Sequence, residues 1–316
     1  MTATLVTGAA GFAGSHLLDL LVAEGVSDSN RLVAWRHKGS NRSDVDRHAN
    51  LVDWQSVDLL DRDAVRAAVA ELRPAAVYHC AGAAHVGRAW DNTERTFAVN
   101  VRGTHNLLDA VRRTGVDARV LIPSSALVYR PADRPLAEDE PLVPSSPYGV
   151  SKLAQEMLAS HSGPHVDVVV ARAFNHIGPR QDPFFAASGF ARRIADIERG
   201  KWEPQISVGN LDARRDLTDV RDTVRAYRLL LESAERNSVF NVCSGESVEI
   251  RVLLEKLTAR ARVPVGITVD AARYRPNDTP LLVGDPTRIR VRFGWTPQIP
   301  LDRTLDDLLA YWRARG

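Results

Sequence analysis

The sequence predicts an α/β fold in which a doubly wound parallel sheet is followed by a smaller, interleaved C-terminal domain. Short apolar, strand-like runs alternate with amphipathic helical patterns as far as residue 172, and this alternation is typical of parallel sheets covered by helices on both faces. A glycine cluster lies between the first strand-like run and the first helical pattern. After residue 173 the alternation ends, and proline, glycine and aromatic residues interrupt the pattern.

Each element is predicted from its own run of residues. The strand-like runs of the sheet are residues 3–7, 31–35, 75–79, 119–123 and 166–172. Helical patterns lie at residues 15–24, 61–72, 93–114 and 147–161. Beyond residue 173 we expect helices at 188–200, 248–262 and 301–313, and strands at 239–242 and 288–292. In the last of these, arginine alternates with apolar residues, as in a half-exposed strand.

The composition excludes several classes of protein. Basic residues number 41 and acidic ones 39, so the net charge of +2 gives no electrostatic footprint for nucleic acid or a membrane surface. The two cysteines, Cys80 and Cys243, form no disulfide framework and favour a reducing compartment. No apolar run has the length of a membrane-spanning helix, and no cysteine–histidine cluster has metal-ligand spacing. We expect a cytoplasmic protein without a metal.

Three glycines shape the turn after the first strand: Gly8, Gly11 and Gly14, in the sequence GAAGFAG. The first permits a tight turn, the second lets the backbone approach a pyrophosphate, and the third lets helix and strand pack closely. Phe12 lies in the same turn. The spacing predicts a dinucleotide-binding site, and the alternative is a structural turn in an α/β protein that binds no nucleotide.

The residues after the second strand indicate which dinucleotide is bound. An Asp or Glu there would accept a hydrogen bond from the ribose 2′-hydroxyl and favour NAD, but residues 34–38 include no acid. Arg36, His37 and Lys38 can pair with a 2′-phosphate instead, so NADP(H) is favoured over NAD(H). The alternative is a solvated basic loop. Asp58 and Leu59 follow the third strand, where a contact with adenine is expected.

The chain of 316 residues exceeds the size at which one core usually stops growing, so we expect two domains. The glycine turn and the alternation assign the first of them to dinucleotide binding. We expect a Rossmann NADP-binding domain over residues 1–172, with residues 215–245 returning to it. Residues 173–214 and 246–316 are expected to form the substrate domain.

Tyr148 and Lys152 are the candidate catalytic pair. Their spacing of four puts both on one helix face. A nearby ammonium favours the phenolate and is expected to lower the tyrosine pKa, which suits an acid that protonates a carbonyl oxygen. Ser125 follows the strand at 119–123, at the carboxyl end where ligands bind in such sheets. The alternatives are an exposed helix pair and a serine that only caps a turn.

Taken together, these motifs resemble the extended short-chain dehydrogenase/reductase family, over essentially the whole chain. The resemblance includes the glycine turn, Asp58-Leu59, the run HCAGA at residues 79–83, NVRGT at residues 100–104, Ser125 and the Tyr148/Lys152 pair. It implies that Ala81, Asn100 and Lys152 also contact the dinucleotide. It further implies a nucleotide-sugar substrate bound by the C-terminal domain, and a homodimer.

A narrower resemblance is to the GDP-mannose branch of that family. It is carried by ARAFNHIGP at residues 171–179, GNLDARRD at 209–216, NVCSG at 241–245 and Arg275-Pro276. By this similarity Asn175 and Arg215 would hold the sugar diphosphate, and Arg275 would bind the nucleotide of a GDP-linked sugar. Arginine forks suit phosphate oxygens, although taken alone such arginines are more often solvated surface charges.

Leu127 decides between activities within this branch. Dehydratases of the branch carry a Glu at this place, and an epimerising synthase carries a Cys, whereas leucine moves no protons. The resemblance therefore implies a ketoreductase: NADPH-dependent reduction of the C4 ketone of GDP-4-keto-6-deoxy-D-mannose, giving GDP-D-rhamnose or its C4 epimer, GDP-6-deoxytalose. The alternatives are a nucleotide-sugar 4-epimerase, a 4,6-dehydratase and a non-catalytic dinucleotide-binding regulator.

Overall fold

The computed structural model of the chain describes residues 2–29, 31–37, 39, 48–163, 166–270 and 279–315, with the backbone alone for residues 28 and 29. The chain divides into two compact units. Unit 1 comprises Met1–Arg130, Glu138–Ala173 and Val224–Asn241, and unit 2 comprises Pro131–Ala137, Phe174–Thr223 and Val242–Gly316.

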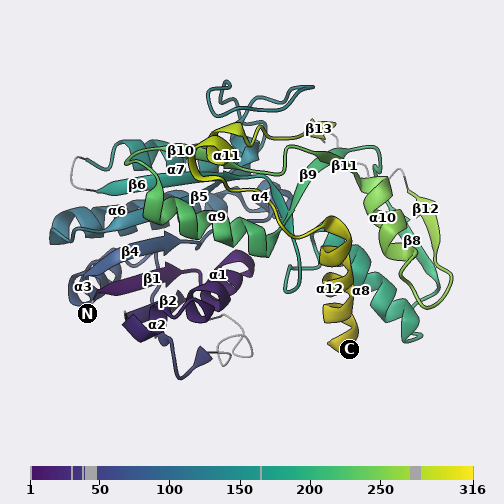
Figure 1. Cartoon of the computed structure of the whole chain (residues 1–316), viewed down its shortest axis with the longest axis horizontal. Coiled ribbons are helices and arrows are strands. Elements are labelled where there is room, and N and C mark those ends of the chain that lie inside the picture. The colour runs from purple at the N-terminus through teal and green to yellow at the C-terminus, as the bar shows by residue number, and fades with distance from the viewer. Residues whose placement is uncertain are drawn as a thin grey trace. The chain divides into compact units, whose positions relative to one another are not determined.

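Unit 1 is built on a seven-stranded sheet with the order β10-β6-β5-β4-β1-β2-β3 (Figure 1). The strands are β1 (Ala3–Thr7), β2 (Arg31–Arg36), β3 (Asp53–Ser56), β4 (Pro74–His79), β5 (Arg119–Ser125), β6 (Asp167–Ala173) and β10 (Val239–Val242). From β3 to β6 every neighbouring pair is parallel. The strand order reverses between β1 and β4, so the predicted doubly wound α/β fold is confirmed.

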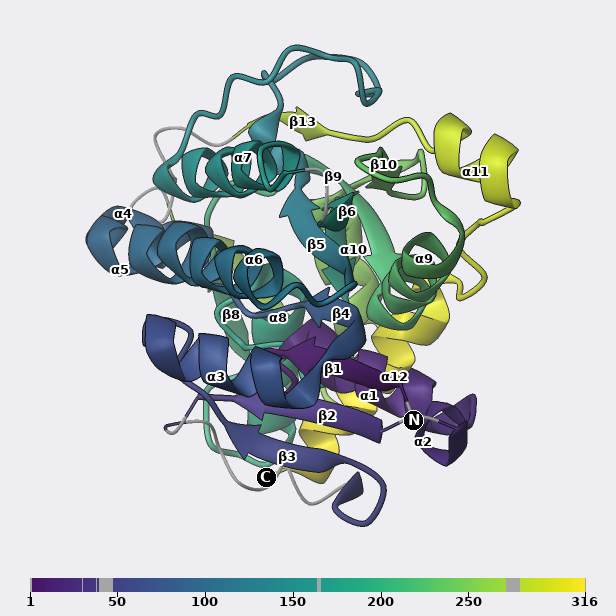
Figure 2. The same cartoon turned by 90° about the vertical axis from the view of Figure 1, so that its left-hand side faces the viewer.

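Helices cover both faces of this sheet. They are α1 (Phe12–Ala23), α2 (Val26–Ser29), α3 (Arg62–Leu72), α4 (Val86–Asp91), α5 (Thr93–Phe97), α6 (Gly103–Thr114), α7 (Pro147–Ser160) and α9 (Val220–Ser233). Figure 2 shows α3, α6 and α7 on one face and α1 and α9 on the other. Between the sheet and the first of these layers, fully buried residues such as Val69, Leu107 and Ile122 belong to one apolar core.

The helix expected at residues 93–114 is interrupted. It consists of α5, a π-helical turn, η3 (Ala98–Arg102), and α6. A π-turn inserts an extra residue into a helix and re-aims its side chains, and such turns are frequent at functional sites. Here the turn carries Asn100, whose side chain is fully buried.

Unit 2 contains small sheets and helices. Its elements are β7 (Asn175–Ile177), α8 (Ala186–Glu198), β8 (Gln205–Val208), β9 (Arg214–Asp219), β11 (Ser247–Glu249), α10 (Ile250–Thr258), β12 (Gly266–Val269), β13 (Leu281–Leu282), α11 (Thr287–Phe293) and α12 (Leu301–Ala314). Strand β9 pairs with β7, β11 and β13, and β8 pairs with β12. Apolar side chains of α8, α10 and α12, including Ile194, Leu254 and Leu308, form its core.

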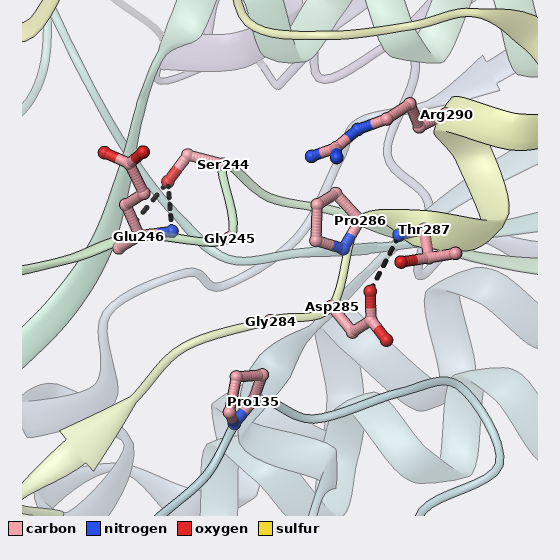
Figure 3. Close-up of a pocket in the computed structure, with 9 residues that line it drawn as sticks. All are labelled: Pro135, Ser244, Gly245, Glu246, Gly284, Asp285, Pro286, Thr287 and Arg290. Atoms are coloured by element: carbon pink, nitrogen blue, oxygen red, sulfur yellow. Dashed lines mark hydrogen bonds between the residues drawn. The ribbon is translucent and has the colours of Figure 1, made fainter.

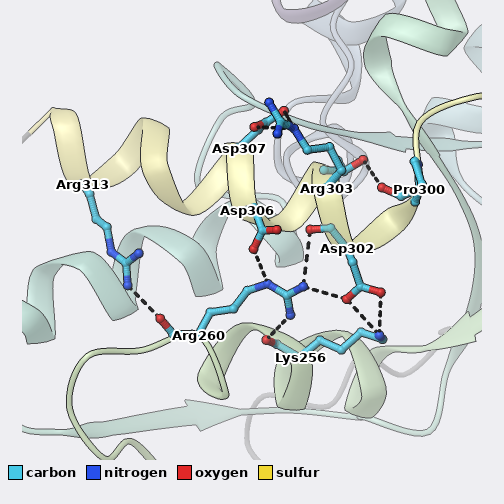
Figure 4. A network of polar contacts seen from close by, with 9 residues as sticks. Lys256, Arg260, Pro300, Asp302, Arg303, Asp306, Asp307 and Arg313 are labelled. Atoms are coloured by element: carbon cyan, nitrogen blue, oxygen red, sulfur yellow. Dashed lines mark hydrogen bonds and ion pairs between the residues drawn. The ribbon is translucent and has the colours of Figure 1, made fainter.

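Ion pairs join α10 and the turn that follows it to α12 at the surface of unit 2 (Figure 4). Arg260 binds Asp302 at 2.6 Å and Asp306 at 2.7 Å, and Lys256 binds Asp302 at 3.0 Å. These carboxylates are more than half exposed, so each pair contributes little to stability on its own. The packing of these helices rests mainly on their buried leucines.

The strand expected at residues 288–292 is wrong: these residues lie in the helix α11. Ile289 is fully buried, while Val291, its supposed partner on one strand face, is 77% exposed. The helix ends at Gly294, whose φ of 67° suits glycine at a left-handed helix end. Short alternating patterns do not distinguish a strand from two helical turns when tertiary burial selects only one apolar residue.

The unit boundaries differ in part from the expected domain boundaries. Residues 215–245 were expected to return to the dinucleotide-binding domain, but only residues 224–241 do so. Residues 215–223 and 242–245 belong to unit 2, where β9 pairs with β7, β11 and β13. Residues 131–137 also belong to unit 2, because Leu136 bridges to Gly284 in parallel and its amide donates to the Val283 oxygen at 3.0 Å.

Candidate active site

The glycine turn lies at the carboxyl end of β1, at the point where the strand order reverses. Gly8 has a φ of 64°, and a Cβ there would lie 2.5 Å from the backbone of Ala81. A Cβ at Gly14 would lie 2.4 Å from the Gly8 oxygen. Gly11 immediately precedes α1, which begins at Phe12. The close approaches leave room for glycine alone, and the N-terminus of α1 follows the turn directly, an arrangement that suits a phosphate.

The loops after β2 and β3 hold the other expected contacts of the dinucleotide. Arg36 ends β2, and within the described part of the chain its buried Nε atom has no hydrogen-bond partner. Lys38 lies outside the described residues. Asp58 accepts a hydrogen bond from the Leu60 amide at 2.9 Å, and the Leu59 side chain packs against Gly103, the first residue of α6.

Asn100 forms hydrogen bonds with the loop after β4 and with α7. Its Oδ1 atom accepts from the Ala83 amide at 2.7 Å, and its Nδ2 atom donates to the Ser151 hydroxyl of α7 at 2.9 Å. A Cβ at Gly82 would lie 3.1 Å from Asn100 Oδ1 and 3.9 Å from the Lys152 ammonium. The structure thus places Ala81 beside the glycine turn, and Asn100 and Lys152 beside that loop.

The three predicted catalytic residues converge at the carboxyl end of β5. Ser125 is the last residue of β5, and Tyr148 lies in the first turn of α7, each 8% exposed. Helix α7 begins there because Ser146 accepts a hydrogen bond from the Gly149 amide at 3.1 Å and Pro147 takes the first position. The Lys152 ammonium donates to the Pro123 oxygen at 2.8 Å, which ties α7 to β5.

Sequence reasoning missed the role of Gly149. A Cβ there would lie 2.4 Å from the Leu127 oxygen, so only glycine lets the first turn of α7 approach the loop that carries Ser125. The signal was available, because glycine directly follows Tyr148, but a helical glycine alone does not indicate a close approach.

Burial controls the protonation of the site. It raises the pKa of Tyr148 to about 12, while the neighbouring Ser125 hydroxyl lowers it. The sequence-based expectation of a lowered tyrosine pKa is therefore wrong for the protein alone, because loss of hydration has the larger effect. Burial also lowers the pKa of Lys152 to about 8, against the opposing influence of Cys80 and Glu156. At neutral pH the phenol is protonated and the ammonium remains charged.

A buried ion pair supports α7 from the side of β6. Arg172 binds Glu156 at 2.7 Å, and its guanidinium lies over the Tyr129 ring at 4.8 Å. Glu156 also accepts a hydrogen bond from Ser124, next to Ser125. Because Arg172 balances the charge of the Glu156 carboxylate, Glu156 forms its ion pair with Arg172 and not with Lys152. Sequence reasoning missed this pair, because its members are sixteen residues apart on different elements.

In unit 2 two of the expected sugar-binding residues are neighbours. Asn175 begins β7 and pairs with Leu217 of β9, and Arg215 lies two residues earlier on β9. Their side chains therefore share one face of that small sheet. Arg215 donates to the Thr279 oxygen at 2.7 Å. Arg275 lies outside the described residues.

Unit 2 also has an open pocket of about 380 Å³ (Figure 3). Its lining residues are Pro135, Ser244, Gly245, Glu246, Gly284, Asp285, Pro286, Thr287 and Arg290. The Ser244–Gly245 loop is held by the buried carboxylate of Asp216, which accepts from the Ser244 amide at 2.8 Å and the Gly245 amide at 3.0 Å. Of the expected site residues that the structure describes, none lines this pocket.

The described residues contain no group of three metal-ligating side chains. Among the helices of that same part of the chain, none is long and apolar enough to span a bilayer.

Known proteins resemble this chain over its whole length. The sequence profile of the GDP-mannose 4,6 dehydratase family matches residues 5–308. The GDP-6-deoxy-D-mannose reductase of Pseudomonas aeruginosa is 36% identical, covering 98% of this chain and 97% of that protein. The human GDP-mannose 4,6 dehydratase is 27% identical, covering 96% of this chain and 90% of that protein.

Solved structures agree. The structure of RMD from Pseudomonas aeruginosa complexed with NADPH has a TM-score of 0.84 at 34% identity, with all of both chains covered. The UDP-glucose 4-epimerase of Thermus thermophilus in complex with NAD has a TM-score of 0.86 at 28% identity, again with full coverage of both chains. The chain therefore belongs to the GDP-mannose 4,6 dehydratase family, the branch that its motifs resemble.

Proposed function

We propose that this protein is an oxidoreductase that uses NADPH to reduce the C4 ketone of GDP-4-keto-6-deoxy-D-mannose. The observation that carries the proposal is the convergence of Ser125, Tyr148 and Lys152 in unit 1, beside the glycine turn. The reductase of Pseudomonas aeruginosa, at 36% identity over nearly the full length of both chains, supports the same substrate.

The cofactor fits unit 1. The turn at Gly8, Gly11 and Gly14 would hold its pyrophosphate, and Ala81 and Asn100 shape the loop beside the turn. When bound, the dihydronicotinamide supplies a hydride to the ketone carbon. Within the described residues the Lys152 ammonium makes two hydrogen bonds, to Pro123 and Gln155, so one of its three N–H groups remains for a ribose hydroxyl.

Tyr148 is suited to act as the proton donor. Its pKa of about 12 keeps the phenol protonated at neutral pH. As the ketone carbon gains a hydride, its oxygen gains negative charge and takes the phenolic proton, which completes the alcohol. The Lys152 ammonium stabilises the resulting phenolate, which is then reprotonated from solvent. Ser125 donates to the same carbonyl oxygen and opposes its charge.

Leu127 makes dehydration unfavourable. Its amide donates to the Ser125 hydroxyl at 3.2 Å, while its aliphatic side chain moves no proton. Eliminating water from a sugar needs an additional acid or base at the site. A ketone reduction needs only the tyrosine, the lysine and the serine.

The preference for NADPH is supported by Arg36. Its buried Nε atom has no hydrogen-bond partner among the described residues, and buried polar groups in proteins generally have one. A 2′-phosphate would accept from this guanidinium. The Pseudomonas aeruginosa RMD structure, which holds NADPH, agrees with this preference.

Recognition of the GDP-linked sugar is assigned to unit 2. We propose that Asn175 and Arg215, on one face of the β7–β9 pair, bind the sugar diphosphate. Arg275 is proposed to bind the nucleotide. An arginine fork matches the oxygens of a diphosphate in charge and in geometry.

A homodimer is also proposed. Trp90 on α4 and Val150 and Met157 on α7 are 54%, 41% and 58% exposed. Trp90 and Val150, together with Phe97 and Pro144, line a shallow pocket. Exposed apolar side chains grouped in this way are typical of a protein–protein interface. Light scattering on the purified protein tests this, and a monomer at all concentrations would contradict it.

The test of function is oxidation of NADPH by the purified protein, which is measured as the loss of reduced-nicotinamide absorbance. We expect rapid oxidation with GDP-4-keto-6-deoxy-D-mannose and slow oxidation with a UDP-linked 4-keto sugar. NMR of the product then gives its C4 configuration, as GDP-D-rhamnose or GDP-6-deoxytalose. Binding of NADPH without oxidation by either sugar would contradict the proposed substrate.

A further inference from the structure

A fully buried amide lies against the candidate catalytic lysine. The Gln155 side chain is 0% exposed, and its Oε1 atom accepts a hydrogen bond of 2.8 Å from the Lys152 ammonium. The two residues are three apart on α7, so they lie on one face of the helix. No step of the proposed reaction uses Gln155.

The orientation of this amide follows from a neighbouring hydroxyl. Thr104 on α6 has one hydroxyl proton, and it donates that proton to the backbone oxygen of Asn100 at 2.6 Å. Its oxygen therefore only accepts from Gln155 Nε2, which lies 2.6 Å away. The amide must present its Nε2 atom to Thr104 and its oxygen to Lys152.

A neutral histidine completes the arrangement. His79 Nε2 lies 2.9 Å from the Thr104 hydroxyl oxygen and must donate to it, because the proton of that hydroxyl is already used. Burial lowers the pKa of His79 to about 3, so its ring has a single N–H at neutral pH. Its Nδ1 atom then accepts from Thr7, 2.8 Å away. Thr7 directly precedes Gly8, so hydrogen bonds connect the glycine turn to Lys152.

We propose that Gln155 is a positioning residue for Lys152, with its amide oriented by Thr104 and His79. A neutral acceptor holds the ammonium in place and favours its charged form, yet leaves its positive charge available to the phenol. A carboxylate at this place would hold the ammonium but cancel its charge. Calling Lys152 catalytic rests on the proposed function, but its contact with Gln155 does not.

The other charged and titratable groups that face Lys152 are few in the described structure. They are the Tyr148 phenol, one helical turn earlier on α7 and protonated at neutral pH, the Cys80 thiol in the loop after β4, the neutral His79 ring, and Glu156 on α7. Glu156 is paired with Arg172 at 2.7 Å, and burial raises the pKa of Cys80 to about 12. Gln155 is therefore the side-chain acceptor whose replacement is expected to change the pKa of Lys152 at neutral pH.

The test is a direct titration of Lys152. The chain has four lysines, Lys38, Lys152, Lys201 and Lys256, so ¹³C labelling at the lysine ε-carbon gives few NMR signals, and Lys152→Met assigns the one of interest. We expect a pKa near 8 in the unaltered protein. Gln155→Met, which has similar length and no strong acceptor, is expected to lower that pKa by about one to two.

Two further variants make the test independent of one substitution. Gln155→Glu retains an acceptor and adds a charge, so it is expected to raise the Lys152 pKa above that of the unaltered protein. Thr104→Val removes the group that orients Gln155 and is expected to lower the Lys152 pKa. Thr114→Val is the matched control, because Thr114 near the end of α6 donates at 2.7 Å to the oxygen four residues back, as Thr104 does, and does not contact Gln155.

The expected pattern is a lower pKa in Gln155→Met and Thr104→Val, a higher one in Gln155→Glu, and no change in Thr114→Val. A Lys152 pKa that stays at its original value in any folded Gln155 variant would overturn the proposal. Folding is checked by circular dichroism and by the signals of the other lysines. Because the titration needs neither cofactor nor substrate, its result is separate from the test of reductase activity.

Discussion

The Lys152 ammonium on α7 donates a hydrogen bond of 2.8 Å to the backbone oxygen of Pro123 on β5. This contact fixes the helix that carries Tyr148 to the strand that ends at Ser125. All three side chains of the candidate catalytic group are thereby held by regular elements rather than by loops, and rigid placement of this kind favours catalysis.

Replacing Tyr148 with Phe removes the proton donor and leaves the ring. We expect kcat for ketone reduction to fall by about 10²- to 10⁴-fold. The dissociation constant of NADPH, measured by the fluorescence of the reduced nicotinamide, is expected to stay nearly unchanged. Activity close to that of the unaltered protein would exclude Tyr148 as the donor.

The pH dependence of kcat/KM for NADPH is expected to show an alkaline loss near pH 8, where Lys152 loses its proton. Tyr148, with a pKa of about 12, remains protonated there. Lys152→Arg keeps its charge at all these pH values, so its residual activity is expected to show no loss near pH 8. A loss at the same pH in both proteins would assign it to another group.

Deprotonation of Lys152 is expected to lower activity but not the stability of the fold. Its pKa is about 8 in the folded protein, whereas an ordinary exposed lysine has a pKa of 10.5. Between these values the unfolded chain binds more protons, so the cost of burying this charged group, which is fully present below pH 8, decreases as the pH rises from 8 to 10.5. Alkaline inactivation near pH 8 is therefore expected without unfolding, which circular dichroism at the same pH checks.

Gly14→Ala is expected to weaken NADPH binding by at least about tenfold, because its Cβ would lie 2.4 Å from the Gly8 oxygen and displace the phosphate-binding turn. Gly266→Ala is the matched control, since its Cβ would make an ordinary contact of 3.6 Å with the Pro204 oxygen in unit 2. Titration calorimetry measures both. Equal affinities in the two variants would place the cofactor elsewhere.

Arg36→Ala is expected to reduce NADPH affinity by about 10- to 100-fold, as loss of a hydrogen bond between charged groups implies, and to change NADH affinity little. The control is Arg31→Ala on the same strand, since Arg31 pairs with Asp53 at the surface. An equal loss of affinity for NADPH and NADH in Arg36→Ala would show that Arg36 does not bind the 2′-phosphate.

Local spacing predicted the features that depend on a few adjacent residues. The glycine turn and the Tyr148/Lys152 helix lie where the sequence places them. The strand predicted at residues 119–123 is also present and continues to Ser125. Features that arise from packing were not predicted. The orientation of Gln155 depends on Thr104, which is 51 residues away, and the raised pKa of Tyr148 depends on burial that the sequence does not display.

The helix at residues 287–293 shows the same limit. Its alternation of arginine with isoleucine and valine suited a strand, but tertiary contacts bury Ile289 and expose Val291. The π-turn at Asn100 was likewise not predicted, and the contacts of the Asn100 side chain there are with Ala83 and Ser151, which are distant in sequence.

The most direct test of the central claim follows the hydride itself. The protein is incubated with GDP-4-keto-6-deoxy-D-mannose and NADPH that carries deuterium at its transferable position, and the product is analysed by NMR. A C4 reductase is expected to place one deuterium at C4 of the product for each NADPH consumed, and Tyr148→Phe is expected to slow this transfer. A sugar changed without consumption of NADPH, or without deuterium at C4, would contradict the assignment of this protein as a 4-ketoreductase.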